Sequence, residues 1–205
     1  MNVIEMIQKY YPAVWSMEEV YEMLLNVKIT LADFLSLFPI TEENPLTDEQ
    51  LVVFRKAKLN ELRDTCNFMI ESGIDVATSN SGKETEHFSL DSYSQSNITN
   101  MFYSVLAGVD QYPYHADGKE CTTYSKEDIV AIYIAAQTEI TYHTTYNNML
   151  RALVNRTEDV DALADITYGM ELPEDLAETM QTNLTTAQVQ IQKILATVTG
   201  GEVLD

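Results

Sequence analysis

Side chains of the kinds that bind metals or act as nucleophiles lie in the second half of the chain: His115, Asp117, Cys121 and His143. Imidazole and thiolate groups are the ligands that zinc takes in tetrahedral sites. The spacing His-x₅-Cys from His115 to Cys121 matches no common zinc pattern, and the sequence contains no Cys-x₂-Cys pair. We therefore expect no metal ion and no other cofactor, with His115, Cys121 and His143 as the residues to test for one.

Cys121 and His143 could instead act as a nucleophile and its general base. Neither an oxyanion-hole motif nor an orienting carboxylate motif accompanies them, and the 7 glycines form no phosphate-binding loop. The acidic pair Glu127-Asp128 is explained by a helix start, where negative charge stabilises the helix dipole. The sequence therefore predicts no catalytic residue and a protein that is not an enzyme. A metal- or thiol-dependent enzyme is the alternative.

A structural role explains the same side chains. Their imidazoles and phenols would hydrogen-bond across a small interior and hold segment 112–124 on the long helix that follows it. Tyrosine suits such an interior because it combines a rigid apolar ring with a polar tip. The residues expected to pack in this way are Tyr112, Tyr114, His115, Asp117, Gly118, Tyr142, His143 and Tyr146.

Local start signals predict the helices that position these residues. In a capping box, a Ser or Thr and an acid or Gln three residues later satisfy each other's backbone N–H groups. Ser16, Thr47 and Ser125 each open such a box. Two or three short helices are expected before Pro39, followed by long helices at about 48–72 and 126–155. Gly73 suits the residue after a helix, because glycine tolerates a positive φ.

The hydrophobic period changes between the two long helices. Alternating residues predict strands at 74–78 and 84–90 that form a hairpin around the turn 79–82. Asp91 or Ser92 can cap a further helix. Segment 112–124 is expected to be an irregular loop or a second small hairpin, with residues 116–118 as its turn. The predicted fold class is therefore α+β and mostly helical, with small hairpins packed on long helices and helical extensions at both ends.

The last helix, which follows Pro173, carries apolar residues in alternating steps of three and four. Isoleucine at both kinds of seam position favours a coiled coil of three or more strands, so the pattern predicts a homo-trimer. The alternative is an amphipathic helix packed on its own domain, which the off-seam Leu195 favours. Gly200-Gly201 is expected to end the helix. The seam consists of Ala177, Met180, Leu184, Ala187, Ile191, Ile194 and Val198.

The overall charge excludes several classes of partner. The 205 residues include 12 Lys and Arg but 32 Asp and Glu, which gives a net charge of −20. Such a chain repels nucleic acid and anionic membrane surfaces. Its 2 cysteines do not make a disulfide framework. We also expect no secretion signal and no membrane span, because the first residues lack the required pattern and no apolar run is long enough.

Several segments between Leu51 and Arg156 resemble signatures of an uncharacterised domain found in bacteriophage tail proteins. Three of these segments are His87-Phe-Ser-Leu90, Tyr114-His-Ala-Asp-Gly118 and Ile140-Thr-Tyr-His-Thr-Thr-Tyr146. The first 40 residues are similar to the very small XkdX-like proteins encoded beside tail-fibre genes, through Tyr10-Tyr11, Trp15 and Lys28-Ile29-Thr30. The other residues that match the tail-protein domain are Arg55-Lys-Ala-Lys-Leu-Asn60, Gln95, Asn97-Ile98, Cys121, Tyr124 and Leu150-Arg151.

The resemblance implies a structural protein of the phage virion, in the baseplate or tail-fibre region, made in the cytoplasm of the bacterial host. As an adaptor or fibre-attachment component it would bind other tail, baseplate or tail-fibre proteins. A tail-fibre assembly chaperone, absent from the mature particle, is the alternative. We expect a docking segment at 1–44, a central α+β domain at 45–156 and an acidic helical segment at 157–205. The expected interaction residues are Tyr10, Tyr11, Trp15, Leu184, Ile191 and Ile194.

Overall fold

The computed structural model describes residues 2–82 and 84–199, the last two without their side chains, so the side chain of Val198 and the expected stop at Gly200-Gly201 lie outside the described part. The described residues form a mostly helical α+β fold with two small antiparallel sheets, which confirms the expected fold class. The chain divides into two compact units. Unit 1 comprises Met1–Cys66 and Asn147–Pro173, and unit 2 comprises Asn67–Tyr146 and Glu174–Asp205.

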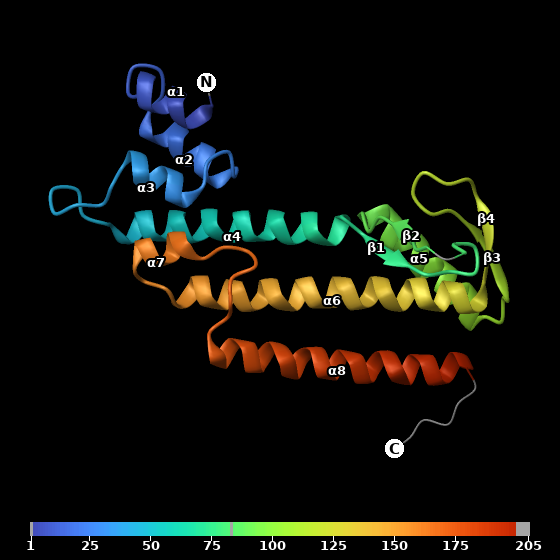
Figure 1. Cartoon of the computed structure of the whole chain (residues 1–205). Coiled ribbons are helices and arrows are strands. Elements are labelled where there is room, and N and C mark those ends of the chain that lie inside the picture. Colours follow the sequence, from blue (N-terminus) through green and yellow to red (C-terminus); the bar gives the residue numbers. More distant parts are fainter. Residues whose placement is uncertain (1, 83, 200–205) are drawn as a thin grey trace. The chain divides into compact units, whose positions relative to one another are not determined.

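Three short helices open unit 1, each started by its own capping box (Figure 1). They are α1 (Val3–Tyr10), α2 (Met17–Leu25) and α3 (Leu31–Leu37). The expected box at Ser16 is present, since the backbone N–H of Ser16 donates to Glu19 at 2.8 Å. The box at Thr47 is present as well and opens α4 (Asp48–Glu71). The local signals at Ser16 and Thr47 therefore placed the starts of α2 and α4 correctly.

An aromatic cluster joins α2, α3 and α4 within unit 1. The ring of Phe34 lies 5.4 Å from Tyr21 and 5.2 Å from Phe54, and Phe54 is fully buried. A helix that the sequence analysis did not assign, α7 (Val160–Asp165), packs against α3. Asp159 caps α7 by accepting from the backbone N–H of Ala162 at 2.7 Å. The aromatic rings and α7 thus hold the short N-terminal helices in place.

Two basic residues of α4 bind the ends of other helices in unit 1. The Arg55 guanidinium donates to the carbonyl oxygen of Thr157, just after α6 (Lys126–Arg156), from Nη2 at 2.8 Å. The ammonium of Lys58 donates to the carbonyl oxygen of Ala164 in α7 at 3.1 Å and pairs with Glu61 at 3.0 Å. Lys58 is only 1% exposed. Helix ends carry unpaired carbonyl groups and partial negative charge, so buried cations suit these positions.

Unit 2 contains both hairpins. Strands β1 (Ile74–Val76) and β2 (Glu86–Phe88) form the antiparallel hairpin that the alternating pattern predicted. Both strands are shorter than expected, and Ile74 lies opposite Phe88. Asp91 caps α5 (Ser92–Leu106). Segment 112–124 forms the second hairpin rather than an irregular loop, with β3 (Gln111–Tyr114) pairing β4 (Thr122–Ser125). Figure 1 shows these elements in green and yellow.

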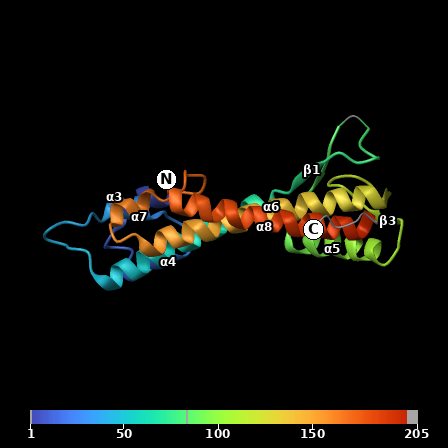
Figure 2. The same ribbon diagram turned by 90° about the horizontal axis from the view of Figure 1, so that it is seen from below.

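The C-terminal helix α8 (Glu174–Thr199) runs along the unit 2 part of α6 in the opposite direction (Figures 1 and 2). Of the expected seam, Leu184, Ala187 and Ile191 are half-buried beside α6. Leu195 is half-buried too, whereas Ile194 is 39% exposed and Ala177 is exposed. The buried or half-buried stripe of α8 consists of Leu176, Met180, Leu184, Ala187, Ile191 and Leu195. This is the spacing of three and four residues that an amphipathic helix has when it packs on its own domain. Among the described residues, no helix has the length and apolar character needed to cross a membrane.

Candidate functional site

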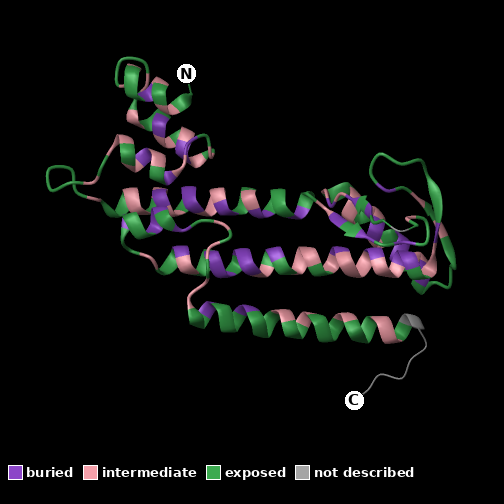
Figure 3. Ribbon diagram, in the orientation of Figure 1, coloured by how far each residue is buried: buried purple, intermediate pink, exposed green. Residues whose placement is uncertain are grey.

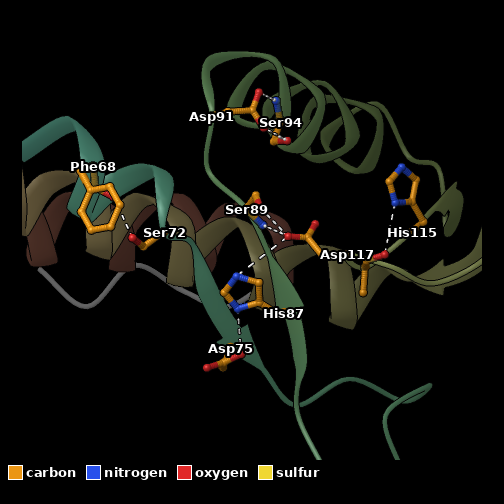
Figure 4. Close-up of polar contacts among 10 residues, drawn as sticks. Phe68, Ser72, Asp75, His87, Ser89, Asp91, Ser94, His115 and Asp117 are labelled. Carbon is orange, nitrogen blue, oxygen red and sulfur yellow. Dashed lines mark hydrogen bonds and ion pairs between the residues drawn. The ribbon is translucent and has the colours of Figure 1, made fainter.

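Asp117 joins the two hairpins of unit 2. Its carboxylate accepts hydrogen bonds from the backbone N–H of Ser89, at 3.1 Å, and from the Ser89 hydroxyl. Its own backbone N–H donates to the carbonyl oxygen of His87 at 2.9 Å. Figure 4 shows the Asp117 side chain turned toward Ser89, beyond the end of β2. Because the contact uses both main-chain and side-chain atoms, it fixes the turn 116–118 against the first hairpin.

His87 lies between two carboxylates at the surface of unit 2 (Figure 4). Its Nδ1 is 3.0 Å from Oδ1 of Asp75, and its Nε2 is 3.9 Å from Oδ2 of Asp117. A protonated imidazole would therefore form one ion pair with Asp75 of its own hairpin and one with Asp117 of the second hairpin. The order of groups is Asp75, His87, Asp117, Ser89. In a Ser-His-Asp triad the imidazole contacts the serine hydroxyl directly, whereas here a carboxylate receives that hydroxyl. The arrangement is that of a structural link and not of an activated nucleophile.

A second carboxylate, Asp128, links the first hairpin to the start of α6. It accepts from the backbone N–H and the hydroxyl of Ser79, at 2.7 and 2.5 Å, and from the Ser125 hydroxyl at 2.8 Å. Asp128 is only 7% exposed. Burial works to raise the pKa of Asp128, but the hydrogen bonds from Ser79 and Ser125 outweigh burial and lower this pKa. The expected capping box at Ser125 therefore also carries a long-range contact.

Aromatic rings fill the space between the hairpins. Phe88 stacks on Tyr114 with ring centroids 6.3 Å apart and meets Tyr124 edge-on at 5.9 Å. Tyr124 is fully buried, and burial followed by the charge of Glu86 raises its pKa to about 12. Burial and then the charge of Asp117 raise the pKa of Tyr114. The hydroxyl of Thr78 donates to the buried Glu86 carboxylate. The phenol groups of Tyr114 and Tyr124 are therefore protonated at neutral pH and act as packing groups.

We expect Asp128→Asn to destabilise the protein at about pH 7 by about 1–3 kcal/mol, because the charged acceptor of the Ser79 and Ser125 hydrogen bonds is lost. The pKa of Asp128 is lower in the folded state, so its contribution is present above the unfolded pKa and is lost as the pH falls through the folded pKa. The difference between variant and wild type should therefore shrink at about pH 2.5. Urea unfolding at both pH values measures it.

The matched control is Glu127→Gln, which removes the exposed acid next to Asp128 on the same helix turn. This change should alter the free energy of unfolding by less than about 0.5 kcal/mol at either pH. An equal loss for Asp128→Asn at both pH values would contradict the assigned role of the carboxylate.

The residues predicted as metal candidates lie on different elements. His115 follows β3 and is exposed, with Nδ1 3.2 Å from the Ala116 carbonyl oxygen, and Cys121 is exposed in the β3–β4 loop. His143 is buried on α6, with Nε2 2.9 Å from the Glu139 carboxylate. Among residues 2–82 and 84–199, no three His, Cys, Asp or Glu side chains are grouped so that they could hold a metal ion.

The residues predicted for packing separate into two groups. Tyr114, Asp117 and the turn glycine Gly118, whose φ is +68°, belong to the link between the hairpins. Tyr112 pairs with Tyr124 across the second hairpin. On α6, Tyr142 stacks on Tyr146 with centroids 6.4 Å apart and meets the His143 ring edge-on. The hydrogen bonds and ring contacts described above attach segment 112–124 to β2. The sequence analysis had expected this segment to be attached to the long helix.

The residues predicted for interaction are accessible only in part. Tyr10, Tyr11 and Trp15 are half-buried, and the ring of Tyr11 meets Phe38 edge-on at 4.9 Å. The sequence analysis missed His87, Asp75, Glu86 and Asp128 as site residues. Ser125-x-x-Asp128 predicted only the helix cap, and alternation within 74–78 and 84–90 predicted only a hairpin. The structure shows that Asp75 lies opposite His87 in it.

Comparison of the chain with protein-family models, with curated proteins and with solved structures gave no match.

Proposed function

We propose that this protein is a structural component of a bacteriophage tail, in the baseplate or tail-fibre region, and acts through protein–protein contacts as an adaptor or fibre-attachment component. The proposal includes a non-enzymatic role, a place in the virion and other tail proteins as partners. It starts from the sequence signatures, and its support in the fold comes from where those signatures lie.

The observation that carries the proposal is the contact between separate signature segments. His87, Phe88 and Ser89 come from one segment, and Tyr114 and Asp117 come from another. Asp117 bonds to Ser89 and to the main chain of His87, while Phe88 stacks on Tyr114. Two more matching residues join them, because the Gln95 amide donates to the Leu90 carbonyl oxygen at 2.6 Å and Tyr124 packs on Phe88. Segments that match one domain are expected to pack together in one core, and these contacts therefore support the proposal.

The polar groups of this core are suited to holding a shape. The Asp117 and Asp128 carboxylates accept from serine hydroxyls and backbone N–H groups on neighbouring segments. Such charge-assisted hydrogen bonds are among the stronger ones in proteins and orient the groups that they join. A rigid domain with accessible faces suits a component that must hold a fixed place in an assembly.

The test is to measure the protein in purified particles of the phage that encodes it. Quantitative mass spectrometry should find it at a fixed ratio to a known tail protein, and antibody labelling should mark the tail end in electron micrographs. A negative control is the same preparation from a phage with the gene deleted.

Absence from purified particles, together with co-purification of the protein with fibre subunits from lysates, would overturn the virion role and favour the assembly chaperone. Presence at a fixed ratio would exclude a chaperone that leaves the mature particle. The two functions therefore give opposite results in one preparation.

A further inference from the structure

The imidazole of His87 has one nitrogen bound and the other facing a negative charge. Its Nδ1 is 3.0 Å from Oδ1 of Asp75 on the neighbouring strand β1. Its Nε2 is 3.9 Å from Oδ2 of Asp117, on the loop between β3 and β4. A neutral imidazole carries a single N–H, and a carboxylate can only accept, so the contact with Asp75 places that hydrogen on Nδ1. The lone pair of Nε2 then points at the Asp117 carboxylate, which is an unfavourable arrangement.

Uptake of a proton by the ring removes this repulsion. The second proton turns Nε2 into a donor and places a positive charge between the carboxylates of Asp75 and Asp117. Histidine is the side chain whose charge ordinarily changes between pH 5 and 8, whereas aspartate is ordinarily ionised in that range. The charge between the two hairpins therefore changes within the pH range that proteins commonly meet.

No other charged side chain is in contact with this imidazole among the described residues. Glu86, the preceding residue of β2, is buried on the opposite face of the strand, where its carboxylate accepts a hydrogen bond from Thr78. The other acids and bases on the adjoining segments form neither a hydrogen bond nor an ion pair with the ring: Glu71, Glu84, Asp91, Lys119 and Glu120. Asp75 and Asp117 are thus the charges that act directly on His87.

The contact between His87 and Asp117 is open to water. The His87 side chain is 44% exposed and the Asp117 side chain 41% exposed. The β3–β4 loop, which carries Asp117, is exposed except at Ala116, and Figure 3 shows most of this loop in green. The ring can therefore exchange protons with solvent while the chain stays folded.

We propose that His87 is a proton-dependent clamp between the two hairpins of unit 2. The protonated ring holds the first hairpin more tightly to the β3–β4 loop, and the neutral ring gives up this additional contact. Since the protonated form favours the attached state, the contribution is present at mildly acidic pH and is lost as the pH rises through the histidine range. The hydrogen bonds between Asp117 and Ser89 remain in both states, so pH adjusts the strength of the link.

This inference goes beyond the proposed function and does not depend on a place in a phage particle. It concerns a regulatory property of the fold, in which the attachment of one hairpin to the other responds to the acidity of the surroundings.

Two backbone amides cross the contact and can report on it. The N–H of Asp117 donates to the His87 carbonyl oxygen at 2.9 Å, and the N–H of Ser89 donates to the Asp117 carboxylate at 3.1 Å. The experiment is hydrogen exchange of the full chain, followed by NMR at about pH 5.5 and about pH 7.5 and corrected for the intrinsic exchange rates. In wild type the protection of both amides should fall at least about threefold as the pH rises. In His87→Gln, which is uncharged at both pH values, this fall should be absent.

The matched control is His115→Gln. His115 is exposed near the same turn, but its Nδ1 lies 3.2 Å from the Ala116 carbonyl oxygen, and no carboxylate pairs with it within the described part of the chain. This variant should keep the pH dependence of wild type. Asp75→Asn retains an acceptor for Nδ1 and removes one of the two negative charges, so it should reduce the fall. It also carries the test if His87→Gln loses its fold.

The proposal is overturned if wild type and His87→Gln show the same pH dependence of protection. Protection that rises with pH in wild type alone would overturn it too, because the neutral ring would then be the form that holds the hairpins. An equal effect of His87→Gln and His115→Gln would likewise contradict a specific role of His87.

Discussion

Gly73→Ala is expected to lower the free energy of unfolding by about 2–5 kcal/mol, because the residue must adopt a positive φ and its new Cβ would collide with the main chain. Gly73 ends α4 with a φ of +86° and leads directly into β1. A Cβ built at this position would lie 2.3 Å from the Phe88 carbonyl oxygen. Since that oxygen belongs to backbone, relief requires the first hairpin to move. Urea unfolding at neutral pH measures the loss.

The control for this prediction is Gly108→Ala. Gly108 has a similar φ of +91°, but a Cβ there meets no atom of another residue within 4 Å. It should lose only the cost of the left-handed conformation, about 1–2 kcal/mol. The difference between the two variants isolates the collision with Phe88. Equal losses would show that the hairpin yields freely to the added methyl group.

Phe54→Ala should cost about 3–5 kcal/mol, the range for removing a fully buried phenylalanine. Phe54 is 0% exposed, and its ring lies 5.2 Å from Phe34 and 6.3 Å from Tyr21. Its removal leaves a cavity where α2 and α3 meet α4. We therefore also expect faster proteolysis within α1–α3 than in wild type, which limited proteolysis with mass spectrometry can follow.

Phe68→Ala is the control for Phe54→Ala on the same helix. Phe68 is 68% exposed, so its loss should change the free energy of unfolding by less than about 0.5 kcal/mol and leave proteolysis of α1–α3 unchanged. A stability loss for Phe54→Ala no larger than this would mean that the aromatic cluster is not the support of the short helices.

Helix starts were predictable from the sequence because their causes lie within four residues. The boxes at Ser16, Thr47 and Ser125 are all formed. The first hairpin followed from alternation and a turn, and Gly73 from its place after a helix. Helix α7 was missed because it is short and follows directly on the long pattern of α6. Its local signals were the cap at Asp159 and the acidic Asp161 in its first turn.

Contacts between distant segments could not be read from spacing. In α4 the apolar Met69 is 38% exposed, whereas the charged Lys58 is buried against Ala164. Periodicity shows which face is apolar, and only the folded chain shows what covers that face. For the same reason the sequence analysis expected segment 112–124 to be held on the long helix, and it did not predict that Asp117 binds Ser89, 28 residues away in sequence. The two compact units also cut across the three expected segments, because α7 belongs with α1–α3.

The buried ammonium of Lys58 makes this residue a built-in reporter of local opening. Amine-reactive reagents label lysines that water can reach, so Lys58 should remain unlabelled while α4 and α7 stay together. Lys56, exposed two residues earlier on the same helix, would be labelled in every state and provides the reference. A change in the ratio of the two labelling rates therefore reports a change in how often local opening exposes Lys58, without unfolding the whole chain.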